Sequence, residues 1–122
     1  MGAELDPDAV SRILKLQPSE AHRKGDARPA STARKYAPFN EGLWCLSSEL
    51  SEDRTLAEHL EALLGELAAH KKALAAIRKN GCRQDIFIGM FSGGGNQGFV
   101  LSLETLGRLH ELGVEVNFDL YP

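Results

Sequence analysis

The chain has 122 residues, of which 43% are hydrophobic and 25% charged, and its formal net charge at pH 7 is −3. This length and composition predict one ordinary domain spanning residues 1–122. The acidic balance argues against wholesale binding to nucleic acid or to anionic membranes. The N-terminus is acidic where a signal peptide is basic, and the two cysteines, Cys45 and Cys82, lack metal-ligand spacing. We therefore expect a cytoplasmic protein with reduced thiols, no bound metal and no membrane partner.

The first 40 residues divide into a helical region (1–16) and a long basic loop (17–40). Asp6 followed by Pro7 is typical of a helix start, because the carboxylate caps the first turn and proline suits the first helical position. The apolar face of this helix is expected to contain Val10, Ile13 and Leu14. Residues 17–40 show no sustained hydrophobic period, which predicts one loop. Residues 12–35 hold seven basic and two acidic residues, whereas the rest of the chain sums to −8.

Residues 41–121 have the pattern of a βαββαβ core. The expected elements are a strand at Glu41–Ser48, a helix at Thr55–Lys79, strands at Gln84–Phe91 and Phe99–Leu101, a helix between Ser102 and Gly113, and a strand at Val114–Leu120. The long helix has leucines and isoleucine at helical spacing (Leu56, Leu60, Leu63, Leu67, Leu74, Ile77). With right-handed crossovers, this order predicts an α+β fold with a ferredoxin-like antiparallel sheet and both helices on one face.

The glycine-rich turn expected at Ser92–Gly98 contains a G-x-G-x-x-G pattern, formed by Gly93, Gly95 and Gly98. Asp119 follows 21 residues later, as an acidic residue does in dinucleotide-binding proteins. That fingerprint requires a helix immediately after the glycines, but the predicted strand at Phe99–Leu101 intervenes. We therefore expect a hairpin turn and no cofactor.

Trp44 and Phe99 lie roughly where RNA-recognition domains of the same element order carry base-stacking aromatics. Gln97 replaces the expected basic residue, and residues 100–103 add no further ring. Both aromatics are therefore interpreted as core residues, although a basic loop can also contact phosphate by charge alone.

No catalytic constellation is recognisable in the sequence. The four histidines, His22, His59, His70 and His110, are scattered over different predicted elements. His59 and His70 would lie about 16 Å apart along the long helix, which is too far for one metal ion. Because no nucleophile set is present, an enzyme is the less favoured interpretation.

Two groups of residues resemble a known family. The first group is Ile13–Pro18 (ILKLQP), Arg23–Asp26 (RKGD) and Leu43-Trp44. The second is EHLEALLGEL together with the C-terminal LSLETLGRLHELGVEVNFDLY. In order and spacing they resemble the bacterial domain of unknown function 4279 family over about residues 6–121. The resemblance implies a small cytoplasmic bacterial α+β protein, with no assigned activity, cofactor or catalytic residue to carry over.

Two features depart from the family pattern. Family members generally have a strand before the first helix, whereas only Met1–Leu5 precede it here. Either the sheet has lost an edge strand, which would expose its neighbour for pairing, or the native chain starts earlier. The family also tends to break the long helix near its middle. Ala68-Ala69-His70 contains no proline, so we expect a continuous helix, with a kink near Gly65 or His70 as the alternative.

The function favoured by these observations is a non-catalytic protein-interaction module, with an unidentified protein as partner. The alternatives are nucleic-acid contact through the basic loop 17–40 and small-molecule binding near the glycine turn 92–98. The candidate contact residues are Arg23, Lys24, Gly25, Arg28, Arg34, Lys35, Gly93, Gly94, Gly95 and Asn96.

Overall fold

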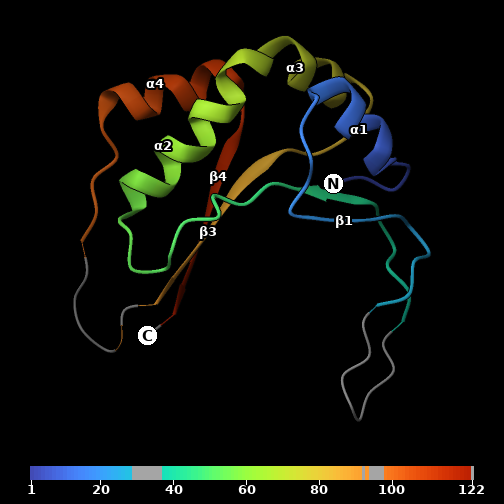
Figure 1. Ribbon diagram of the computed structural model, residues 1–122, viewed down its shortest axis with the longest axis horizontal. Coiled ribbons are helices and arrows are strands. Elements are labelled where there is room, and N and C mark those ends of the chain that lie inside the picture. Colours follow the sequence, from blue (N-terminus) through green and yellow to red (C-terminus); the bar gives the residue numbers. More distant parts are fainter. Residues whose placement is uncertain (29–36, 92, 94–97, 122) are drawn as a thin grey trace. The chain divides into compact units, whose positions relative to one another are not determined.

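The computed structural model describes residues 1–28, 37–91, 93 and 98–121 (Figure 1). The chain forms two compact units, of which unit 1 is Met1–Ser47 with Lys72–Arg83 and unit 2 is Ser48–Lys71 with Gln84–Pro122. Each unit has its own buried apolar side chains. Those of unit 1 are Leu5, Val10, Leu14, Leu74 and Ile77, and those of unit 2 are Leu60, Leu64, Ile86, Leu109 and Leu112.

Unit 1 begins with helix α1, Pro7–Leu14, which confirms the predicted start. The Asp6 side chain caps the helix by accepting a hydrogen bond from the backbone N–H of Asp8 at 3.0 Å. Val10 and Leu14 are buried as expected, but Ile13 is 47% exposed. The helix ends where Lys15 adopts a left-handed conformation, with φ of 55°.

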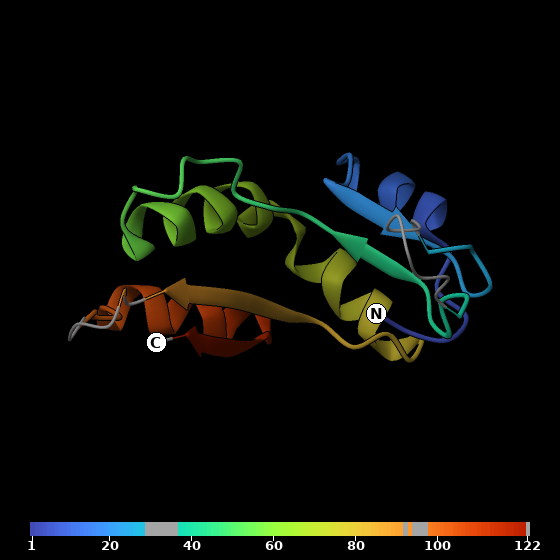
Figure 2. The ribbon, with the colours of Figure 1, turned by 90° about the horizontal axis from the view of Figure 1, so that it is seen from below.

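The expected loop at 17–40 contains a strand, so that prediction is wrong in its first part. Strand β1, Glu20–His22, pairs antiparallel with strand β2, Leu43–Cys45. The two strands run side by side in both ribbon views (Figures 1 and 2). The predicted strand at 41–48 is correspondingly shorter. A three-residue strand leaves too short a hydrophobic period to recognise, so this pairing had no signal in the sequence.

The first residues of unit 1 pair with two later segments. Gly2 and Gly42 form an isolated antiparallel bridge, and the backbone N–H of Gly42 donates to Gly2 O at 2.8 Å. On the other side, the backbone N–H of Arg83 donates to Met1 O at 2.8 Å. These bonds give the N-terminal segment strand-like pairing on both sides.

The long helix is broken, which contradicts the local expectation of a continuous helix at 55–79. Helix α2, Leu56–Leu67, is followed by a 3₁₀ turn, Ala68–His70, and by helix α3, Lys71–Lys79. A 3₁₀ turn has about 3.0 residues per turn instead of 3.6, so it interrupts the regular helical spacing of the apolar residues. Leu60 and Leu64 of α2 are buried in unit 2, and Leu74 and Ile77 of α3 are buried in unit 1, so Leu64 is buried where Leu63 was expected.

Unit 2 contains a βαβ motif made of strand β3 (Asp85–Phe91), helix α4 (Leu103–Leu112) and strand β4 (Glu115–Tyr121). The strands pair in parallel from Asp85↔Glu115 to Phe91↔Tyr121. The helix limits match the prediction, because Ser102 Oγ accepts from the backbone N–H of Thr105 and Gly113 ends α4 with φ of 71°. Helices α2 and α4 are joined by an ion pair between Arg108 and Glu61, with N–O distances of 2.8 and 3.0 Å.

The ferredoxin-like sheet is not present in the described residues, which form two separate two-stranded sheets. The predicted strand at 99–101 is the cause of the error, because residues 98–102 have no regular secondary structure. Without that strand, β3 connects through α4 directly to a parallel neighbour. The fold remains α+β in content. No described helix has both the length and the apolar character needed to cross a membrane.

Candidate functional site

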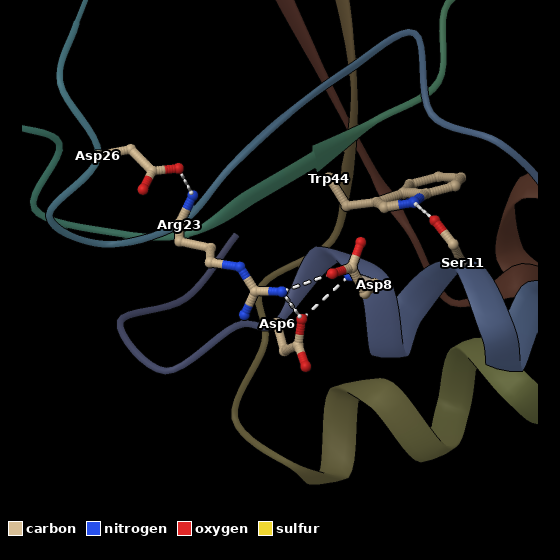
Figure 3. Close-up of polar contacts among 6 residues, drawn as sticks. All are labelled: Asp6, Asp8, Ser11, Arg23, Asp26 and Trp44. Atoms are coloured by element: carbon tan, nitrogen blue, oxygen red, sulfur yellow. Dashed lines mark hydrogen bonds and ion pairs between the residues drawn. The ribbon is translucent and has the colours of Figure 1, made fainter.

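The basic loop was the first candidate site. Its Arg23 forms ion pairs with two aspartates of unit 1 (Figure 3). Arg23 Nη2 lies 2.6 Å from Asp8 Oδ2 and 2.8 Å from Asp6 Oδ1. The backbone N–H of Arg23 also donates to Asp26 Oδ2 at 2.8 Å. Asp6 is the helix cap, so Arg23 ties β1 to the start of α1. The charge of Arg23, expected to be available to a partner, is neutralised by these two carboxylates within the chain.

The beginning and the end of the loop are joined by backbone hydrogen bonds just after Arg23. The backbone N–H of Gly25 donates to Phe39 O at 2.7 Å, and that of Phe39 donates to Asp26 O at 3.0 Å. Gly25 has φ of 91°, a conformation that L side chains rarely adopt. We call these residues, 23–26 with Phe39, the loop neck. Their role is structural, because their backbone groups bond to one another.

An aromatic stack lies beside the loop neck. The rings of His22 and Phe39 are stacked with centroids 3.5 Å apart, and the Arg28 guanidinium carbon lies 4.9 Å from the Phe39 centroid. Arg28 and Lys24 are exposed cations of this region. The other candidate residues of the loop, Arg34 and Lys35, lie outside the described residues.

Trp44 is not fully buried, which corrects its interpretation as a core residue. Its side chain is half-buried on β2, and its indole N–H donates to Ser11 Oγ of α1 at 3.0 Å (Figure 3). Phe99, the other expected core aromatic, is 43% exposed and stacks on Phe118 with centroids 5.1 Å apart.

The glycine turn and the cavities give little support to a small-molecule site. Gly93 has φ of 66°, whereas Gly94, Gly95 and Asn96 lie outside the described residues. A cavity of about 150 Å³ in unit 2 is lined by Leu64, Ala68, Lys71, Arg108, Glu111 and Leu112. Its volume is well below the several hundred Å³ typical of a small-molecule site. Within the described part of the chain, no cluster of His, Cys, Asp or Glu has the arrangement of a metal site.

A contact between Ser48 and His59 had no signal in the sequence. Ser48 Oγ lies 2.5 Å from His59 Nδ1, which joins the segment before α2 to the first turns of that helix. Nucleophilic catalysis would also need a group that orients the imidazole. The contact links two residues eleven positions apart within unit 2. The pair is best explained as a local structural contact.

Unit 2 has an exposed aromatic face on the β3–β4 sheet that the sequence did not indicate. Phe87 is 65% exposed, Phe91 72% and Tyr121 43%. The rings of Phe91 and Tyr121 are stacked with centroids 4.7 Å apart. On the opposite face, Ile86 is buried, whereas Phe118 is 36% and Leu120 64% exposed, so that face is covered only near the start of the strands. We call the face with Phe87, Phe91 and Tyr121 the open face. Alternation in β3 was visible in the sequence, but both faces carry apolar residues, so the pattern did not reveal the open side.

Polar side chains accompany the aromatic rings on the open face. Asn117 Nδ2 donates to Asp85 Oδ2 at 2.5 Å across the two strands. The Tyr121 hydroxyl donates to the Asp119 carboxylate. This hydrogen bond, the negative charge of Asp119 and a small effect of burial raise the pKa of Tyr121 above its ordinary value. The open face therefore combines aromatic rings with carboxylates held by neighbouring side chains.

Comparison with known families gives one match, to the domain of unknown function DUF4279, over residues 1–122. The chain belongs to the DUF4279 family. No curated protein and no solved structure matches it. The break between α2 and α3 agrees with the interrupted long helix expected from the DUF4279 resemblance.

Proposed function

We propose that this DUF4279 protein is a non-catalytic protein-interaction module that contacts its partner through the open face of the β3–β4 sheet. The observation that supports this proposal is the exposure of Phe87, Phe91 and Tyr121 on one face of one sheet. Exposed aromatic clusters of this kind are typical of interaction surfaces, because binding removes their apolar area from water. Aromatic residues are also over-represented among the residues that dominate binding energy.

The basic loop is a second candidate surface, but fewer of its cations are free to bind a partner than its sequence suggested. Of its candidate cations, Arg23 is held by Asp6 and Asp8. Arg28 lies over the Phe39 ring. Proteins that bind single-stranded nucleic acids combine cations and aromatic rings, which contact phosphates and bases. Nucleic-acid contact through Lys24 and Arg28 is therefore the alternative function.

Affinity capture from host lysate tests both candidates. The tagged chain is compared with Phe91→Ala, and with Leu103→Ala as a control, since Leu103 is an 87% exposed apolar residue on a different element. We expect a stoichiometric protein that resists nuclease, that is lost with Phe91→Ala and that is retained with Leu103→Ala. Equal capture by both variants would contradict the sheet face as the binding surface.

Nuclease treatment separates the alternative function. Co-purifying nucleic acid that disappears with nuclease, and also with Lys24→Glu plus Arg28→Glu, would favour the basic loop. A preparation that carries neither protein nor nucleic acid would contradict both candidates.

A further inference from the structure

The open face of the β3–β4 sheet has an ordered arrangement of charge. The parallel register divides it into four successive rows across the two strands: Asp85 with Glu115, Phe87 with Asn117, Gly89 with Asp119, and Phe91 with Tyr121. Rows one and three carry carboxylates, whereas rows two and four carry aromatic rings. Successive rows on one face of a strand lie about 6.6 Å apart, because each residue advances the strand by about 3.3 Å.

Direct contacts confirm that these side chains share one face. Asn117 bonds to Asp85 across the strands, and Tyr121 bonds to Asp119 and stacks on Phe91. A Cβ added at Gly89 would lie 3.9 Å from the Phe87 ring, so Gly89 also faces this side and leaves open space in the third row. Neither β3 nor β4 has a Lys or Arg on either face.

Both edges of this two-stranded sheet are unpaired within the part of the chain that the structure describes, and the edge of β4 is the one next to Glu115 and Asp119. Within the described residues, β4 pairs only with β3, so the outer edge of β4 presents backbone N–H and C=O groups with no strand beside them. An extended peptide can add to such an edge, with its backbone forming the hydrogen bonds and its side chains reading the face.

We propose that the β4 edge of this sheet binds an extended, cationic peptide segment that places Arg or Lys at every fourth position and apolar residues midway between them. This partner is a more specific form of the proposed function and rests on it. Residues i, i+2, i+4 and i+6 of an added strand share one face, so such a segment presents cation, apolar, cation, apolar. This order matches the rows of the open face in either strand direction after a shift of one row.

Charge complementarity selects this occupant. Glu115 and Asp119 are the β4 residues four positions apart, and each would lie opposite a cation of the added strand. The intervening apolar residue would lie in the row that holds Phe87. Arg or Lys side chains that cross the sheet also meet the faces of exposed rings, which attract cations. A polyanion would instead meet like charge in rows one and three.

Two labelled peptides of identical composition test the proposal by fluorescence anisotropy. The spaced peptide is Arg-Thr-Val-Thr-Arg-Thr-Val, and the clustered peptide is Arg-Thr-Arg-Thr-Val-Thr-Val. We expect the spaced peptide to bind at least about tenfold more tightly, because only its cations and apolar residues coincide with the rows. N-methylation of its alternate backbone nitrogens should abolish binding, since it removes the hydrogen bonds to the β4 edge without changing the charge.

Matched protein variants locate the site. Glu115→Gln with Asp119→Asn removes two charges from the face with isosteric side chains, and Glu104→Gln with Glu111→Gln removes two exposed charges from α4. We expect the first variant to lose about tenfold in affinity and much of the salt dependence, and the second to bind like the native chain. Circular dichroism of each variant confirms that it is folded.

Three results would overturn the proposal. Equal affinity for the spaced and clustered peptides would reduce the interaction to net charge, and equal loss in both double variants would place it elsewhere. Absence of saturable binding by either peptide would also reject it. If a lysate protein is nevertheless captured through Phe91, the proposed function survives with a different partner, whereas failure of both experiments rejects the proposed function itself.

Discussion

The guanidinium of Arg23 lies 2.6 Å from the carboxylate of Asp8, fifteen residues earlier in the chain. This ion pair joins strand β1 to helix α1 within unit 1. A charged residue that the sequence presents as part of a basic contact loop therefore helps to hold the loop in place. The distinction matters for mutagenesis, because Arg23 and Lys24 are adjacent in sequence but differ in what they contact.

Charge reversal at Arg23 should lower the free energy of unfolding more than charge reversal at Lys24. Arg23→Glu replaces an ion pair to Asp6 and Asp8 with repulsion, and the partners are partly exposed, so we expect the free energy of unfolding to fall by about 1 kcal/mol. Lys24→Glu at an exposed position should change it by less than about 0.5 kcal/mol. Urea denaturation of both variants measures the difference. Equal stability of the two variants would contradict the structural role of Arg23.

Gly42 should not tolerate a side chain. A Cβ at Gly42 would lie 2.5 Å from Leu5 O and 3.0 Å from Leu5 Cβ, so Gly42→Ala must push the N-terminal segment away. We expect a loss of about 1–3 kcal/mol, as for other overpacked sites. Gly65 is the matched control, because it lies in α2 with nothing within 4 Å of the added Cβ. Gly65→Ala should stabilise the chain by about 0.5–1 kcal/mol through helix propensity.

The bond from Trp44 to Ser11 should be measurable as a coupling. Ser11→Ala and Trp44→Phe each remove the hydrogen bond, which is worth about 0.5–1.5 kcal/mol. We expect the double variant to be more stable than the sum of the two losses predicts, because the bond can be lost only once. Trp44→Ala should cost about 2–3 kcal/mol, less than a fully buried aromatic, since Trp44 is half-buried. Additive losses in the double variant would show that the bond contributes nothing.

Tyr121 should ionise above the ordinary tyrosine pKa of 10.0. Asp119→Asn removes the negative charge that favours the neutral phenol, so the pKa of Tyr121 should fall towards its ordinary value. Because the pKa is raised by folding, the stabilising contribution is complete below pH 10 and is lost as pH rises through the folded-state pKa. Near-ultraviolet absorbance of tyrosinate, measured in a Tyr36→Phe background that leaves Tyr121 as the remaining tyrosine, follows the titration. Identical titration with and without Asp119→Asn would contradict the contact.

Local sequence signals predicted the helix limits well, because capping is decided over three or four residues. Thr55 Oγ1 accepts from the backbone N–H of Glu58 at 3.2 Å, as the capping pattern at the start of the long helix predicts. Gly113 ends α4 in the left-handed conformation for which glycine was expected. Such interactions are complete within one turn and leave a clear pattern of residue types.

Strand partners were predicted poorly, because pairing depends on which distant segment supplies the hydrogen bonds. β1 is recognisable only from its partner, since Ala21 pairs with Trp44 across 23 residues. The glycine-rich segment led to the opposite error, in which residues 99–101 were assigned a strand for which the described chain has no partner. Because no strand lies between β3 and α4 in the described residues, the chain crosses over through α4 and β4 pairs with β3 in parallel.

The charge pattern of the sequence did not show which cations have partners within the chain. The basic loop as a contact surface stays a prediction, and the ion pairs of Arg23 were not foreseen, because Asp6 and Asp8 lie in another element. The aromatic face on β3 and β4 was missed for a related reason. Alternation identifies the two faces of a strand, whereas burial of one face is decided by the elements that pack against it.

The residue patterns were sufficient to predict the capped starts of α1, α2 and α4, the end of α4 at Gly113, the α+β content and the membership in the DUF4279 family. Each of these follows from residue types at short range or from the order of motifs along the chain. The break in the long helix, the pairing of the strands and the ion pairs of Arg23 became known from the three-dimensional structure. The physical reason is that packing and ion pairing depend on distances between residues far apart in sequence, and no local pattern specifies those distances.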